Sequence, residues 1–232
     1  MKDLKLFLVF FITEGFLLSN CQLNKNVKMI NIEKKIASEL VNYGYDKLFQ
    51  SGSNTIIDSL YDNGKNTKSL INIVSKREFD ILARLLASEI LFTKQKDYPP
   101  KYLYGPLGDV YALALLITGD TANPKLSGNL WGYMYEADRL GIKDDGRLGT
   151  HLLGLGEESL PFLIPLLDEE STITYEGSQE ATIGNALNYR VKDAAAYYIS
   201  KIKNIPVKFY QDFEERDKEI ERLKNQLKTD KK

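Results

Sequence analysis

The sequence predicts an all-α protein, and three observations support this fold class. Apolar residues return every three or four positions in most segments after residue 28, which is the period of an amphipathic helix. The alternation of apolar and polar residues that is typical of strands is scarce. Glycine and proline residues separate the periodic segments, at positions where they end one helix or open the next.

The composition excludes several classes of function. The chain has 232 residues, of which 43% are hydrophobic and 27% are charged, and its formal net charge is -1. This length suits one domain with a real core. A nearly neutral chain lacks the basic excess that binding to nucleic acid requires. With one histidine and one cysteine, it also lacks the residues for most metal sites, an internal disulfide and most His-based or Cys-based catalysis. We therefore expect no metal and no cofactor.

Residues 1–20 have the pattern of a secretory signal peptide. Lys2 and Lys5 give a positive start, and an unbroken apolar run follows from Leu6 to Ile12. This run is too short to cross a bilayer, which takes about 20 apolar residues, but it fits the apolar region of a signal peptide.

The residues Leu18-Ser19-Asn20-Cys21 resemble the lipobox of bacterial lipoproteins. In that family the cysteine receives a diacylglycerol and becomes the new N-terminus. The resemblance implies a mature protein that is anchored to the bacterial cell envelope through a lipid on Cys21, facing the periplasm or on the outer membrane, with residues 21–27 as a tether. In the alternative interpretation, residues 4–18 form a core helix and Cys21 is a small buried residue.

The first half of the domain, predicted over residues 28–206, contains several helical patterns. One amphipathic helix is indicated by Met29, Ile32, Ile36, Leu40 and Tyr43. A second helix ends at Asn63-Gly64, and a short one covers residues 70–74. Ser75 and Glu78 have the spacing of a capping box, which predicts that they open a helix through Ile90.

The most apolar segment lies near the middle of the chain. Residues 110–117 (VYALALLI) are apolar on all sides, which fits either a buried strand or a buried helix. Pro106 suits the first turn of a helix and Gly119 suits its end, so we expect a central buried helix. A further helix is expected over residues 130–140, ending at Gly141.

Residues 147–203 resemble a HEAT repeat, a family of paired antiparallel helices. The resemblance depends on a proline at Pro161 or Pro165, Asp168, the pair Val191-Lys192 and the alanines 194–196. It implies that alanine side chains allow two helices to approach closely, and that the domain is a HEAT-like array of helix pairs. This chain departs from the family in one respect, because residues 171–188 separate the two helices.

Residues 207–232 form a charged tail that is predicted to be helical. Phe213, Ile220, Leu223 and Leu227 have nearly heptad spacing, and Glu219 with Arg222 and Glu221 with Lys224 form pairs three residues apart. Two heptads are few for a coiled coil, so the sequence favours a solvated helix.

Two groups of residues have both a functional and a structural interpretation. The single histidine, His151, lies beside two leucines on a predicted helix, which favours a core or interface role over that of a catalytic base. An aromatic cluster is able to stack on sugars or to pack in a core, and we favour packing. The cluster comprises Tyr98, Tyr102, Tyr104, Tyr111, Trp131, Tyr133 and Tyr135.

The segment 171–188 is the candidate for partner binding. It exceeds the usual 2–8 residues of a connection between helices, and long ordered connections often carry binding residues. It contains Tyr175, Glu176, Gln179 and Glu180 as candidate contacts. An inserted short helix over residues 180–187 explains the segment equally well.

The sequence therefore predicts a membrane-anchored envelope lipoprotein that acts as a non-catalytic scaffold for a protein partner, because stacked helix pairs offer an extended surface. One alternative is an immunity-type inhibitor lipoprotein that uses Glu176 and Glu180 against a basic toxin. The other is a carbohydrate or small-ligand binding module that uses the Tyr/Trp cluster.

Overall fold

A computed structural model describes residues 29, 31–50, 54–120, 125–132 and 146–229 of the chain. The predicted signal peptide, Cys21 and the tether lie outside these residues, as does most of the helix expected over residues 130–140.

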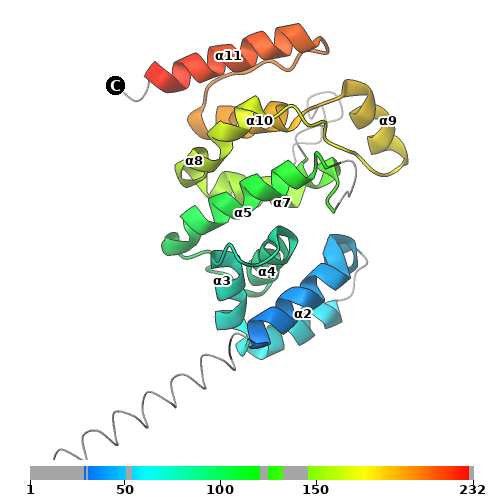
Figure 1. The fold of residues 1–232 in the computed structure, drawn as a ribbon, viewed down its shortest axis with the longest axis vertical. Coiled ribbons are helices and arrows are strands. Elements are labelled where there is room, and N and C mark those ends of the chain that lie inside the picture. The colour runs from blue at the N-terminus through cyan, green and yellow to red at the C-terminus, as the bar shows by residue number, and fades with distance from the viewer. Residues whose placement is uncertain (1–28, 30, 51–53, 121–124, 133–145, 230–232) are drawn as a thin grey trace, which may run out of the picture.

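The described residues confirm the all-α class, because they form helices and short helical turns that stack along the long axis of the molecule (Figure 1). The first half contains a helix over residues 31–45, η1 (Asp46–Gln50), α2 (Asn54–Tyr61), η2 (Asp62–Gly64), α3 (Thr67–Ser75), α4 (Ile81–Lys94), η3 (Lys101–Leu103), α5 (Tyr104–Ile117) and η4 (Gly128–Trp131). The second half contains α7 (Gly146–Gly154), η5 (Gly156–Ser159), α8 (Leu160–Leu163), η6 (Ile164–Asp168), α9 (Ser178–Leu187), α10 (Val191–Lys203) and α11 (Phe213–Thr229). Within these residues the only β-type pairing is an isolated bridge between Thr172 and Arg190.

The boundaries of α2, α3 and α4 follow partly from the predicted signals. Asn63 and Gly64 have positive φ angles of 49° and 88°, so the turn they form ends α2 as expected. The predicted capping box is wrong. Ser75 is the last residue of α3, where its hydroxyl donates to the carbonyl of Ile71, and Asp80 caps α4 by accepting from the backbone N–H of Leu82.

Helix α5 is the predicted central helix. Pro106 lies in its first turn, and Leu107, Val110, Ala114 and Leu115 are buried. The helix packs against α3 and α4 on the N-terminal side of the stack and against α7, α8 and α10 on the C-terminal side. It therefore connects the two halves of the molecule.

Helix α10 packs closely against the layer before it. Its three alanines, Ala194, Ala195 and Ala196, have no exposed surface, and α10 contacts α7, α8 and η6. The absence of larger side chains allows this approach. Tyr198 on the same helix donates a hydrogen bond to the carbonyl of Trp131 at 2.6 Å.

The C-terminal helix is not the solvated helix that the sequence favoured. Helix α11 packs on α10, and Ile220, Leu223 and Leu227 are buried while Phe213 is 44% exposed. The two predicted ion pairs are present, with Arg222 2.8 Å from Glu219 and Lys224 2.7 Å from Glu221. The apolar side chains at nearly heptad spacing therefore pack against α10 of the same chain and not against a second chain.

A pair of glycines in α7 tests this packing. A Cβ atom at Gly149 would lie 2.5 Å from both the Trp131 carbonyl and the Tyr198 hydroxyl, whereas at Gly154 nothing lies within 4 Å. We expect Gly149→Ala to lower the free energy of unfolding by about 2–3 kcal/mol, because the new methyl group displaces one end of a buried hydrogen bond. Gly154→Ala is the matched control and should leave stability unchanged or raise it by up to about 1 kcal/mol. Urea unfolding measures both, and equal effects of the two variants would contradict the packing described.

Candidate functional site

The most unusual chemical group in the described core is the carboxylate of Glu89. Its side chain has no exposed surface, although it lies in the middle of α4. A buried carboxylate costs several kcal/mol unless charged or polar partners compensate it. Three side chains from two other helices provide that compensation: Tyr111 on α5, and His151 and Arg147 on α7.

The contacts divide between the two carboxylate oxygens. The Tyr111 hydroxyl donates to Oε1 of Glu89, and Nδ1 of His151 lies 2.8 Å from the same oxygen. Arg147 donates through Nε to Oε2, and through Nη2 to the backbone carbonyl of Glu89 at 3.2 Å and the hydroxyl of Thr93 at 2.6 Å. The carboxylate oxygen Oε1 of Glu89 is a hydrogen-bond acceptor. Nδ1 of His151 therefore carries the hydrogen of the bond between them.

Aromatic rings enclose this cluster. The imidazole of His151 stacks on Phe92, with 3.7 Å between centroids and 6° between planes, and the guanidinium of Arg147 lies 4.6 Å from the centre of the Phe49 ring. Tyr111 contacts Trp131 edge to face at 6.4 Å. The cluster is therefore packed on several sides, and 21% of the His151 side chain is exposed.

The net effect on Glu89 is a lowered pKa. Burial favours the neutral acid, but the hydrogen bond from His151, the charges of His151 and Arg147 and the hydrogen bond from Tyr111 together outweigh it. Glu89 is thus an ionised hydrogen-bond acceptor and not a proton donor at neutral pH.

The geometry of the cluster allows two roles. A carboxylate bonded to Nδ1 of a histidine is half of a catalytic triad, but a triad also needs a nucleophile bonded to the imidazole. Within the described part of the chain, His151 makes hydrogen bonds only to Glu89 and Tyr111. The arrangement therefore matches the predicted core role of His151, in which it ties α7 to α4.

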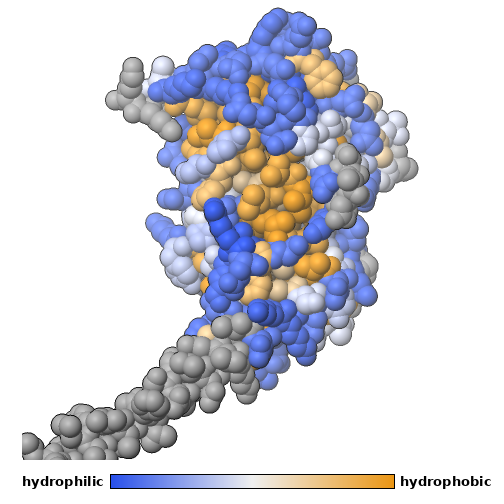
Figure 2. Space-filling model, viewed as in Figure 1, coloured by the Kyte–Doolittle hydropathy of each residue, from blue (hydrophilic) through white to orange (hydrophobic). Residues whose placement is uncertain are grey.

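A second feature is the outer face of α5. Residues 113, 116 and 117 follow Asp109 at helical spacing, and Leu113 is 36% exposed while Leu116 and Ile117 are partly exposed. Figure 2 shows apolar side chains gathered over a hollowed area in the middle of the molecule, where Figure 1 places α5 and α8. We call Leu113, Leu116 and Ile117 the open face of α5.

The candidate binding segment is tied into the fold. Tyr175 is 3% exposed, and its ring packs against the backbone at Gly128 and Gly184. The backbone N–H groups of Gly128 and Thr174 donate to the carbonyls of Thr174 and Thr118, at 2.7 and 3.2 Å. The segment thus contains the inserted short helix, α9, on a hydrogen-bonded connection.

The four candidate contacts of this segment are not equally accessible. Glu176 is exposed, and its backbone carbonyl accepts from Asn129 at 2.5 Å. Gln179 and Glu180 lie in α9, and their side chains are outside the described structure. The ring of Tyr175 is buried. Of the two candidate contacts whose side chains the structure describes, Tyr175 and Glu176, only Glu176 is therefore accessible to a partner.

The aromatic cluster is mainly a packing feature. Tyr98, Tyr111 and Trp131 are 8%, 0% and 0% exposed, whereas Tyr102 is 70% exposed. Tyr104 is partly buried, and Tyr133 and Tyr135 lie outside the described residues. The described rings do not form the exposed surface on which a sugar would stack.

A network of charged side chains joins α10 to α11. Asp193, which has no exposed surface, lies 3.0 Å from Arg190 and 2.7 Å from Arg216. Arg190 also lies 2.7 Å from Asp217, and Phe213 lies 4.9 and 4.6 Å from the guanidinium groups of Arg190 and Arg216. Burial raises the pKa of Asp217, but hydrogen bonds from Arg190 and Lys192 lower it further than burial raises it. This network holds the last helix on the body.

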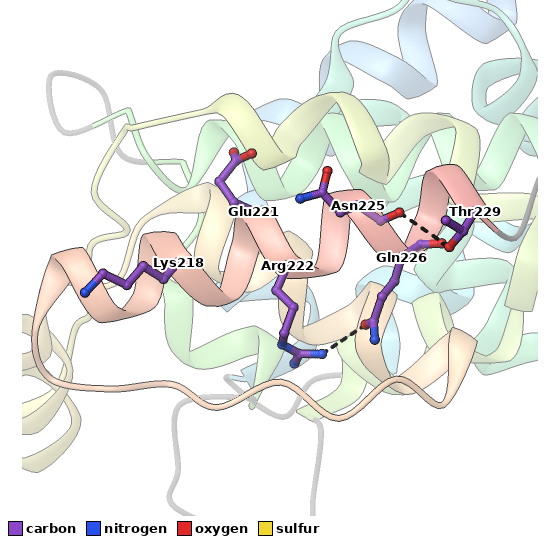
Figure 3. A pocket seen from close by; sticks show the side chains of 6 residues that line it. All are labelled: Lys218, Glu221, Arg222, Asn225, Gln226 and Thr229. Atoms are coloured by element: carbon purple, nitrogen blue, oxygen red, sulfur yellow. Dashed lines mark hydrogen bonds between the residues drawn. The ribbon is translucent and has the colours of Figure 1, made fainter.

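Two surface hollows lie along α11, and neither has the features of a built site. The larger is a strip on the outer side of α11, lined by Lys218, Glu221, Arg222, Asn225, Gln226 and Thr229 (Figure 3). All six come from one helix, and Arg222 donates to Gln226 at 3.0 Å. The other, of about 230 Å³, lies beside the ion pairs of Lys192 and Lys224. Charged and polar residues provide most of the lining of both hollows.

The described residues include no group of three or more histidine, cysteine, aspartate or glutamate side chains arranged to hold a metal ion. No helix among them is long and apolar enough to cross a membrane.

Comparisons of the chain with protein-family models, with curated proteins and with solved structures find no match.

The role of Glu89 gives a prediction about stability. We expect Glu89→Gln to lower the free energy of unfolding by about 3 kcal/mol at pH 7, because Arg147 loses its buried counter-charge. A lowered pKa in the folded state contributes stability above the ordinary glutamate pKa of about 4.3, and this contribution is lost as the pH falls through the folded value. The difference between the wild type and the variant should therefore narrow in acid, as measured by urea unfolding from pH 7 to pH 3.

The control for this experiment is Glu78→Gln, which changes an exposed carboxylate in the loop before α4. We expect this change to alter stability by less than about 0.5 kcal/mol at every pH. A Glu89→Gln deficit that stays constant down to pH 3 would show that Glu89 does not act through its charge.

Proposed function

We propose that the chain is a non-catalytic interaction scaffold, anchored to a bacterial envelope through a lipid on Cys21, which binds a protein partner on the open face of α5. One observation carries the binding role. Helix α5 is apolar on all sides over residues 110–117, and a helix of this kind is normally buried all round. Here the described part of the chain leaves Leu113 36% exposed.

The continuity of the open face supports this proposal. Apolar residues that are scattered singly on a surface need no explanation, but contiguous patches mark sites of interaction. Leu113, Leu116 and Ile117 are contiguous on one helix face, because they are three or four residues apart or adjacent in the sequence. An apolar centre with charged residues at its edge is the usual anatomy of a protein interface.

The HEAT-like arrangement is part of the proposal. It is supported by the contact of α10 with α8 and η6, by Pro161 in α8 and Pro165 in η6, and by the buried alanines of α10. Stacked helix pairs expose a long side surface, which suits a scaffold. The envelope location is supported by the lipobox-like residues before Cys21.

Replacement of Leu113 tests the binding role. We expect Leu113→Lys to change the free energy of unfolding by less than about 1 kcal/mol, because the side chain is already partly exposed. The same change should weaken binding of the partner by at least about thirtyfold, the size of effect expected at the centre of an interface. Co-purification from detergent-solubilised envelopes, followed by titration of the recovered partner, measures the effect.

The chain offers a matched control in Ile32→Lys. Ile32 is 39% exposed and lies on the helix over residues 31–45, away from α5 in the sequence. We expect this variant to recover the same partner with unchanged affinity. If both lysine variants, or neither, lose the partner, the open face of α5 is not the binding surface.

The anchor is tested separately. We expect Cys21→Ser to move the protein from the membrane pellet to the supernatant after cell fractionation, because the acceptor for the lipid is removed. Metabolic labelling with a radioactive fatty acid should mark the wild type and leave the serine variant unlabelled. A serine variant that stays in the pellet would refute anchoring through Cys21.

A further inference from the structure

We propose that the element which covers the open face of α5 is an amphipathic helix of the partner protein, with a carboxylate at the end that lies beside Arg77. This inference rests on the proposed function, and it specifies the chemistry of the partner. It depends on the spacing of the exposed residues, on the position of α8 and on the charges at one edge.

The spacing of the exposed residues fits a helix. Leu116 and Ile117 follow Leu113 by three and four residues, so the three side chains form a ridge on one side of α5, and the buried Asp109 lies one turn before Leu113. Ridges of this kind pack into the grooves of a second helix, with axes 8–10 Å apart. The backbone polar groups of α5 are used within the helix, so the face offers side-chain packing and no free edge for an added strand.

Helix α8 covers another side of α5. A Cβ atom at Gly108 would lie 3.0 Å from Cδ2 of Phe162 and from the Cα of Ser159. The glycine therefore allows α8 to lie directly on α5 near Gly108, on a side of α5 other than the open face. A rod-shaped partner would fit along α5 on the side that α8 leaves uncovered.

The charges at one edge favour an acidic group on the partner. The carboxylate of Asp109 lies 2.7 Å from Arg77 and 2.9 Å from Arg84, so two guanidinium groups share one carboxylate. The side chain of Arg84 is 3% exposed, whereas that of Arg77 is 73% exposed. Arg77 uses Nε and Nη2 on Asp109, and its Nη1 makes no hydrogen bond to a described residue. An excess positive charge thus lies at the surface, next to the apolar ridge.

This combination selects one class of occupant. Leucine or similar residues at positions i, i+3, i+4 and i+7 of the partner helix would cover Leu113, Leu116 and Ile117. An aspartate or glutamate in the end turn of that helix would then reach Arg77, in a charge-assisted hydrogen bond.

Site-specific photo-crosslinking tests the inference in the full-length protein within the envelope. The photoreactive residue p-benzoylphenylalanine replaces Leu113, Leu116 or Ile117, one position at a time, and Ile32 serves as the control position. Mass spectrometry of the cross-linked peptides then identifies the residues that are contacted. We expect the three α5 positions to mark residues on one face of a single helical segment, spaced by three or four, and the Ile32 position not to mark that segment.

Charge reversal provides the second readout. We expect Arg77→Glu to reduce the yield of the Leu113 cross-link by at least about tenfold. Replacement of the partner carboxylate by arginine should restore the yield in the Arg77→Glu protein. A yield that is insensitive to Arg77→Glu would overturn the assigned charge.

The remaining outcomes separate the inference from the proposed function. Cross-links to a partner segment without helical spacing would overturn the inference and leave the scaffold function in place. Cross-links only to the same chain, to a second copy of it or to lipid would overturn both, as would the absence of cross-links from all three α5 positions.

Discussion

The buried carboxylate of Glu89 is the constraint on which the middle of the fold depends. Once this group is removed from water, α5 must bring Tyr111 to it, and α7 must bring His151 and Arg147. A shift of either helix would leave a charge without a partner, at a cost of several kcal/mol. The carboxylate therefore fixes how three helices lie against one another, which apolar packing alone specifies less strictly.

Other buried acidic side chains also join neighbouring parts of the helical stack. Glu33 of the first helix contacts Asn72 of α3 and Lys76, the residue that follows α3. Asp109 joins α5 to Arg84 of α4. Asp193 joins α10 to Arg216 of α11. Each of these acids is buried, and each is paired with a cation from another part of the chain. Buried ion pairs add little net stability, but each of these pairs restricts how the two segments that it joins lie against one another.

Helical periodicity was sufficient to predict the class of fold, and the positions of Pro106 and Gly119 were sufficient to predict the central helix. Helical periodicity was less informative about where each helix begins and about which charged side chains are buried. The spacing of Ser75 and Glu78 fits a capping box, but the residue that caps α4 is Asp80, five residues after the predicted cap at Ser75. Glu89 was overlooked because it is charged, although it follows Leu82 and Leu86 on the same helix face by seven and three residues. Its partners, Arg147 and Tyr111, are distant in the sequence, and no local pattern indicates such contacts.

The orientation of α11 limits how copies of this protein are able to assemble. Its apolar residues face α10, and the opposite side carries Lys218, Glu221, Arg222 and Gln226 in water (Figure 3). A helix with a charged outer side offers a second molecule little apolar surface to pack on, so this side of α11 is poorly suited to contacts between copies of the chain.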